Sequence, residues 1–124
     1  IAKKYNLDLK KTYEGIKISS GNSFVHETES QVILNGSYNI NFTMDLVEKD
    51  MSLFNKLSKD LDINLEIAPF VLDIFKDAKE KFGSRAWSSM VVKRLEDKYG
   101  INFREKGFPD ELVDDEPEDK GREV

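Results

Sequence analysis

The chain has 124 residues, of which 35% are charged and 39% hydrophobic, and a formal net charge of −5. This length predicts one domain with a modest core, and no apolar run approaches the ~20 residues that a membrane span needs. The chain has no cysteine and one histidine, His26, which excludes disulfides, a cysteine nucleophile and any metal site that needs two imidazoles. The first residues do not resemble a secretory leader, so we expect a soluble, cytoplasmic protein.

The negative charge is concentrated at the C-terminal end. Residues 105–124 hold nine acidic and three basic residues, a balance of −6, whereas residues 1–104 hold 16 basic and 15 acidic residues, a balance of +1. We therefore predict a domain over residues 1–104 that is followed by an acidic tail, 105–124. A nearly neutral body without a basic stripe disfavours nucleic acid as a partner.

The spacing of apolar residues predicts helices almost throughout the chain. Residues 1–5 have the pattern of the last turn of a helix, and the chain therefore looks like an excerpt from a longer protein. Asp8 is a suitable N-cap for a helix that stops at residues 19–21. Ser23 can cap a second helix, which Asn35 and Gly36 close.

A third, longer helix is predicted over residues 43–61, and a fourth has Pro69 in its first turn and ends at Gly83. The fifth opens at Ser84 or Ser88 and ends at Gly100. Only residues 38–42 alternate even weakly like a strand. The pattern therefore predicts an all-α domain of five helices plus the end of a sixth. The expected core consists of Leu46, Leu53, Leu57, Ile74, Phe75, Val91 and Leu95.

The third helix contains a charge where its apolar pattern predicts burial. At ~100° per residue, its large apolar residues form one arc, with Asp50 at the centre and Lys49 at the edge. A buried carboxylate needs a hydrogen-bonding or cationic partner. Asp50 either pairs with a neighbouring lysine or caps another helix, or this face lines a cleft in a larger protein. Periodicity alone does not choose between these alternatives. The arc consists of Leu46, Leu53, Phe54, Leu57 and Leu61.

Outside the third helix, the sequence offers little chemistry. His26 lies among polar residues and is expected to be a surface or hydrogen-bonding histidine. No metal site is predicted, and neither a G-x-G-x-x-G nor a G-x-x-x-x-G-K-[ST] pattern is present to cradle a phosphate.

Residues 42–53, which read FTMDLVEKDMSL, resemble the F-x-x-D-L-x-x-K-D-L-x-L signature of the β-hydroxyacid dehydrogenases. That family includes 3-hydroxyisobutyrate dehydrogenase and tartronate semialdehyde reductase. Residues 2–8 resemble its A-x-x-x-G-L-D helix end, and residues 83–96 resemble its closing G…S-A-V-I-x-x-L-E segment, in the family's order. The resemblance covers about residues 1–97. Asn6 stands where glycine is usual, and Met51 and Phe54 replace a leucine and a small residue.

The resemblance implies a helical bundle similar to the C-terminal domain of 6-phosphogluconate dehydrogenase. Such a domain closes over NAD or NADP held by an N-terminal Rossmann domain, and these domains pair in homodimers. By this resemblance, Lys49 would approach the nicotinamide end of the cofactor, and Phe42 would line the pocket beside the reacting carbonyl. Asp50 would orient Lys49 or the catalytic lysine. The family's G-x-x-x-K-x-x-N pattern, which carries that lysine, is absent from this sequence.

The leading hypothesis is therefore the C-terminal domain of an NAD(P)-dependent dehydrogenase that acts on a small β-hydroxy acid such as 3-hydroxyisobutyrate. It would supply a pocket wall and a dimer surface, and it would be inactive alone. The alternative is a non-catalytic helical interaction module on the same scaffold. A glycine-rich phosphate loop and the lysine pattern in sequence upstream of Ile1 would favour the enzyme.

Overall fold

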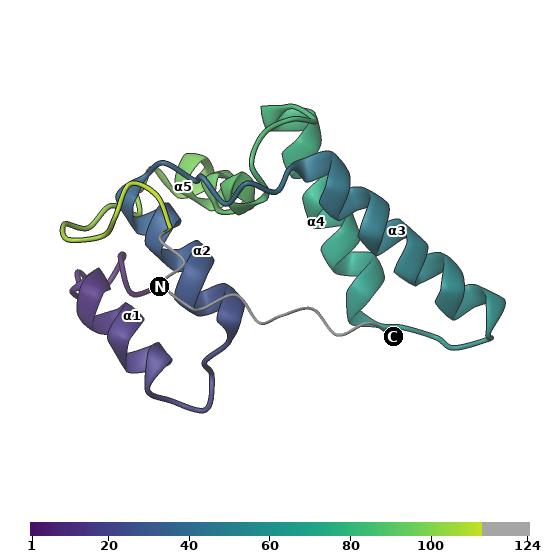
Figure 1. Cartoon of the computed structure of the whole chain (residues 1–124), viewed down its shortest axis with the longest axis horizontal. Helices are drawn as coiled ribbons and strands as arrows, with labels where there is room; N and C mark the ends of the chain where they lie inside the picture. The colour runs from purple at the N-terminus through teal and green to yellow at the C-terminus, as the bar shows by residue number, and fades with distance from the viewer. Residues whose placement is uncertain (113–124) are drawn as a thin grey trace, which may run out of the picture.

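A computed structural model describes residues 1–112 of the chain, and the last part of the predicted acidic tail lies outside the described residues. Within them, the fold is all-α, as predicted, with one isolated bridge between Thr43 and Trp87 and no strand. Figure 1 shows the hairpin of the third and fourth helices standing apart from the other helices. The elements are α1 (Leu9–Lys17), α2 (Phe24–Asn35), α3 (Met44–Asp60), α4 (Ile67–Phe82), the short 3-10 helix η1 (Ser88–Val92) and α5 (Lys93–Tyr99).

Local capping chemistry accounts for the predicted starts of α1 and α2 and for the predicted end of α2, whereas α1 ends at Lys17, just before the predicted stop. The Asp8 carboxylate accepts a hydrogen bond from the Lys11 backbone N–H at 2.9 Å, and the Ser23 hydroxyl accepts one from the His26 N–H at 3.0 Å. Gly36 follows α2 in the left-handed conformation, with φ of 95°. The fifth predicted helix is split into η1 and α5.

Residues 1–7 are not assigned as a helix, but their hydrogen bonds follow the pattern of a helix C-terminus, which the sequence predicts for residues 1–5. The Tyr5 N–H bonds to the Ile1 carbonyl at 3.0 Å, and the Leu7 N–H reaches back to the Ala2 carbonyl at 3.0 Å. The Asn6 N–H bonds to the Lys3 carbonyl at 3.1 Å, which completes a Schellman motif. Asn6 has a positive φ of 56°, a conformation that glycine adopts most readily. This geometry explains the glycine that the resembling family has at this position.

The predicted core is wrong in detail. Leu53, Leu57 and Leu95 are exposed, and Leu46, Ile74, Phe75 and Val91 are only half-buried. The buried apolar side chains belong instead to α1, α2, the connector after α2, the start of α3, and the inner face of α4. They are Leu9, Tyr13, Val32, Leu34, Tyr38, Met44, Leu72 and Ala78.

The error on α3 has a simple cause: the helix packs through a face other than its most apolar one. Met44 and Asn55 are the buried residues of α3. On a wheel of ~100° per residue with Leu46 at zero, they lie near 160° and 180°, whereas Asp50 lies near 40°. The face that packs on α4 is therefore roughly opposite to the apolar arc. Within residues 1–112, that arc is largely uncovered.

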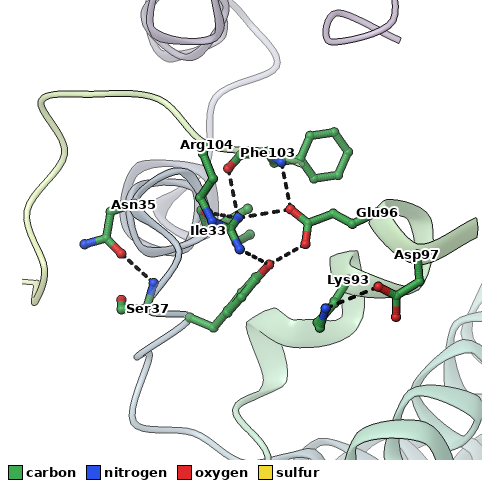
Figure 2. A network of polar contacts seen from close by, with 9 residues as sticks. Ile33, Asn35, Ser37, Lys93, Glu96, Asp97, Phe103 and Arg104 are labelled. Carbon is green, nitrogen blue, oxygen red and sulfur yellow. Dashed lines mark hydrogen bonds and ion pairs between the residues drawn. The ribbon is translucent and has the colours of Figure 1, made fainter. Parts of the chain in front are cut away.

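A buried polar network joins α2, α5 and the segment after α5 (Figure 2). The Tyr38 hydroxyl donates to Glu96 Oε2 at 2.5 Å, and Arg104 donates to Glu96 Oε1 at 3.0 Å and to the Tyr38 oxygen at 2.7 Å. The Phe103 N–H also donates to Glu96 Oε1, at 2.7 Å. Glu96 is only 5% exposed, and a charge so deeply buried is tolerated because it is paired. Burial, followed by the hydrogen bond to Glu96, raises the pKa of the Tyr38 hydroxyl.

The segment after α5 returns to the first two helices. The Glu105 N–H donates to the Leu34 carbonyl at 2.9 Å. Phe103 and Phe108 pack against the cluster of Leu9, Tyr13 and Leu34, and the Phe108 ring meets the Tyr13 ring edge-on at 5.2 Å between centroids. Aromatic side chains from the C-terminal part of the chain thus complete the core around α1.

No helix among residues 1–112 is both long and apolar enough to cross a bilayer.

Candidate functional site

Lys49 and Asp50 form an ion pair on the outer face of α3. Their ammonium and carboxylate groups lie 3.1 Å apart, and the two side chains are 59% and 56% exposed. The prediction that Asp50 is buried in an apolar stripe is therefore wrong, because α3 turns its apolar arc away from α4. The structure confirms the alternative in which Asp50 pairs with a neighbouring lysine.

The segment 84–88 holds the beginning of α3 in place. The Met44 N–H donates to the Ala86 carbonyl at 2.9 Å, and the Asp45 N–H donates to the Ser84 carbonyl at 3.1 Å. The Met44 side chain is fully buried beneath them. The first turn of α3 is therefore fixed by long-range backbone hydrogen bonds, and the ion pair one turn further on projects from a rigid base.

Side chains reinforce the same attachment. The Thr43 hydroxyl donates to the Asp45 carboxylate, the Leu46 N–H donates to it at 3.0 Å, and Arg85 donates to it at 3.2 Å. These contacts, with the Thr43 hydrogen bond the largest, lower the pKa of Asp45. One turn later, Glu48 forms an ion pair with Lys79 of α4. Asp45 and Glu48, in the first two turns of α3, thus attach the helix to its surroundings. Among residues 1–112, Asp50 forms its one ion pair with Lys49.

Phe42 lies just before the helix, with its side chain exposed. Its carbonyl accepts a hydrogen bond from the Ser88 N–H at 2.8 Å, which fixes its backbone. Seven residues at ~1.5 Å each place Lys49 about 10 Å further along the helix direction. The structure therefore brings Lys49 and Asp50 into contact and leaves Phe42 apart from them, just before the start of α3.

His26 has a structural role, in line with the expectation of a hydrogen-bonding histidine. Its Nε2 lies 3.0 Å from the Tyr13 carbonyl oxygen, to which it donates, and its Nδ1 lies 3.2 Å from the Ser30 hydroxyl. The imidazole also stacks on the Tyr13 ring at 4.9 Å between centroids. A hollow of about 190 Å³ lies beside it, walled mainly by apolar side chains such as Ile33 and Leu34. Both ring nitrogens of His26 therefore make hydrogen bonds, and the side chain joins α1 to α2.

In the described part of the chain, no group of three or more histidine, cysteine, aspartate or glutamate side chains is arranged to hold a metal ion.

Sequence reasoning missed the polar groups that the fold itself brings together. Tyr38 lies 58 residues before Glu96 and 66 before Arg104, and Asp45 lies 40 residues before Arg85. No local motif joins residues so far apart. The positive φ of Tyr38, 55°, is likewise set by its surroundings rather than by residue type.

Comparison with known proteins identifies the scaffold. Residues 1–95 match the family described as NAD-binding of NADP-dependent 3-hydroxyisobutyrate dehydrogenase. The chain is also 25% identical, over 107 residues, to the L-threonate dehydrogenase of Haemophilus influenzae, an alignment that covers 86% of this chain. The chain spans about a third of the length of that relative, since the alignment covers 35% of it. The cofactor of this family is NAD or NADP, and residues 42–50 lie inside the matched segment. The chain therefore belongs to the family of NAD-binding domains of NADP-dependent 3-hydroxyisobutyrate dehydrogenases.

Proposed function

We propose that this domain forms the cofactor-closing part of an NAD(P)-dependent oxidoreductase that acts on a small β-hydroxy acid such as 3-hydroxyisobutyrate. The observation that carries the proposal is the family match over residues 1–95, which includes the Lys49–Asp50 pair on the uncovered face of α3. In this proposal, residues 1–104 form the body of the domain, residues 105–124 are an acidic segment whose first residues pack back onto it, and the protein works in the cytoplasm as a homodimer.

The residues present suit one wall of a dinucleotide site rather than a whole one. Lys49 offers an exposed ammonium group on a helix whose base is rigidly held. The sequence contains no G-x-G-x-x-G turn, so residues 1–124 do not cradle the cofactor phosphates by themselves. A dinucleotide-binding half would have to lie against the outer face of α3.

A bound nicotinamide supplies hydride transfer, and the protein supplies binding and orientation. Lys49 would add positive charge beside the cofactor, and the Asp50 carboxylate, 3.1 Å away, would keep that ammonium group in place. The exposed Phe42 ring would cover the reacting carbonyl and exclude water from it. Charge and coverage of this kind favour the transition state of a hydride transfer, in which negative charge develops on the substrate oxygen.

The test uses an enzyme in which this chain is joined to a dinucleotide-binding half. Lys49→Ala should raise the KM for the cofactor and lower kcat, and Asp50→Asn should lower kcat. Because both side chains are more than half exposed, neither substitution should change stability by more than ~1 kcal/mol. The control is Lys56→Ala, which removes another exposed lysine of α3, one paired with Asp60 at 3.5 Å.

The outcomes separate the alternatives. Wild-type kinetics in both variants would end the assigned roles of Lys49 and Asp50. An intact, folded protein that binds no dinucleotide and oxidises no β-hydroxy acid would leave the alternative of a non-catalytic interaction module. A large loss of melting temperature in either variant would show that the pair is structural, since an ordinary exposed ion pair contributes no more than ~1 kcal/mol.

A further inference from the structure

The segment after α5 bridges parts of the chain that are far apart in sequence. We call residues 101–110 the strap, and residues 1–17, which include α1, the entry segment. The strap lies after the segment that matches the family, which ends at residue 95. Its Phe108 ring meets the Tyr13 ring of α1 edge-on, and its Glu105 N–H donates to the Leu34 carbonyl of α2. The strap therefore contacts the first two helices at once.

One end of the strap is fixed by the buried polar network of Figure 2. Arg104 donates to Glu96 of α5 at 3.0 Å and to the Tyr38 oxygen at 2.7 Å. It also donates to the Ile33 carbonyl of α2 at 3.1 Å. A carboxylate as buried as that of Glu96 is strongly destabilising once its cationic partner is removed. Small displacements of the strap are therefore unfavourable, and it leaves only when water reaches Glu96.

The aromatic side chains of the strap cover the entry segment. Phe103 and Phe108 pack against a cluster that includes Leu9 and Tyr13 of α1, and Ala2 packs against the same cluster. Departure of the strap would expose these apolar groups to water, which is unfavourable in proportion to the area uncovered. The strap thus stabilises the entry segment from its first turn to the middle of α1.

The other attachments of the entry segment within residues 1–112 are mainly polar. Besides the histidine bridge described above, the Tyr13 hydroxyl donates to the Glu27 carbonyl at 3.2 Å, and Lys17 pairs with Glu27 at 3.5 Å. Lys4 donates to the Tyr99 carbonyl of α5 at 3.1 Å, at an exposed position. Exposed charge contacts of this kind contribute little stability.

The entry segment and the α3–α4 hairpin lie at opposite ends of the molecule (Figure 1). Among the residues that the structure describes, no hydrogen bond or ion pair joins the two. Parts of a protein that share few contacts can open separately, each with its own free energy. The hairpin can therefore stay folded while the entry segment moves.

We propose that the strap holds the entry segment in one fixed orientation. While Arg104 and Phe108 are docked, the entry segment, α2 and α5 move as one body. When the strap leaves, the entry segment turns about the loop of residues 18–23, and the α3–α4 hairpin keeps its fold. One consequence rests on the proposed function: a dinucleotide-binding half joined before Ile1 is directed toward Lys49 by the docked strap.

The first test is amide hydrogen exchange of residues 1–124, measured by mass spectrometry. Phe108→Ala removes the ring that contacts Tyr13 and keeps the Arg104 network. It should accelerate exchange in α1 and in the strap together, each by about tenfold, and change exchange in α3 and α4 by less than about twofold. The matched control is Phe70→Ala, which removes a ring that is 67% exposed on α4 and should leave exchange in α1 and the strap unchanged.

The second test is the distance between two spin labels, one on the entry segment and one on the hairpin. The chain has no cysteine, so Tyr5→Cys and Leu57→Cys, at positions that are 76% and 59% exposed, place the labels cleanly. The labelled chain should give one narrow distance distribution. Adding Arg104→Gln and Phe108→Ala should broaden it, while circular dichroism shows that the helices remain.

Three results would overturn the proposal. One is exchange in α1 that stays unchanged while exchange in the strap rises, since the strap would then hold nothing. Another is equal acceleration in all helices, or loss of the helical signal in the doubly substituted chain, since strap and hairpin would then form one cooperative unit. The third is a distance distribution that stays narrow in that chain. Neither test involves a cofactor, so a joined enzyme that is inactive although its entry segment is held would contradict only the proposed function.

Discussion

Asn55 is a buried amide that weakens the packing of α3 on α4. It is 8% exposed, and neither its Oδ1 nor its Nδ2 has a hydrogen-bond partner among residues 1–112. An amide buried without partners costs ~1–3 kcal/mol by the measure of protein substitutions. Asn55→Leu removes both polar atoms from a position that faces the inner side of α4, where Leu72 is buried.

We therefore expect Asn55→Leu to stabilise the domain by ~1–3 kcal/mol. A change of 1 kcal/mol shifts the melting temperature of a domain of this size by roughly 4–8 °C. The larger leucine has room, because a hollow of about 250 Å³ adjoins Asn55. The measurement is unfolding by urea and by heat, followed by circular dichroism.

Ser52→Leu is the control, since Ser52 lies one turn earlier on α3 and is exposed. It should change stability by no more than ~0.5 kcal/mol. Asn55→Asp should destabilise the domain, because a buried carboxylate without a partner is costlier than a buried amide. If Asn55→Leu is neutral or destabilising while Ser52→Leu behaves as expected, the amide is satisfied in solution and the reasoning is refuted.

Further predictions concern conformation, pH and binding. Asn6→Gly should keep or raise the melting temperature, and Asn6→Ala should lower stability by ~1 kcal/mol in urea unfolding, because the φ of 56° is left-handed. Gly36→Ala should destabilise the domain in the same assay, because φ is +95° and a Cβ would collide with the Arg104 side chain; an unchanged urea midpoint would contradict this. Burial raises the pKa of the Glu29 carboxyl. At a pH above that pKa the ionised carboxylate lowers the free energy of unfolding, and this loss disappears as the pH falls and the carboxyl is protonated. Glu29→Gln should therefore be more stable than wild type at pH 7 and lose that advantage below about pH 4, in urea unfolding at both pH values. Purified residues 1–124 should show no reduction of NAD or NADP with 3-hydroxyisobutyrate in a spectrophotometric assay; a clear rate would refute the assignment of the phosphate site to another domain.

Local chemistry made the helices predictable. Asp8, Ser23 and Gly36 cap helix ends through hydrogen bonds to residues within one turn, so the local sequence is enough to predict those ends. The packed faces were less predictable, because periodicity shows which side of a helix is apolar but not which side meets a neighbour. On α3, the apolar arc stays largely exposed and Asn55 is buried instead.

The polar contacts in and around the candidate site likewise include some that the sequence predicts and some that it does not. Lys49 and Asp50 are adjacent in sequence, so their pairing could be anticipated, and their candidate roles came from the resemblance. The network of Tyr38, Glu96 and Arg104 could not be foreseen, because it depends on how the segment after α5 returns to α2.

The return of the C-terminal segment to α1 determines the order in which the chain can fold as it is synthesised. The α3–α4 hairpin is made of contacts close in sequence and can form as soon as its residues have left the ribosome. The cluster around Leu9 and Tyr13 instead waits for Phe103 and Phe108, which are made about a hundred residues later. The apolar face of α1 therefore stays partly uncovered while α2 to α5 are synthesised, and it is completed only when the segment after α5 has been made.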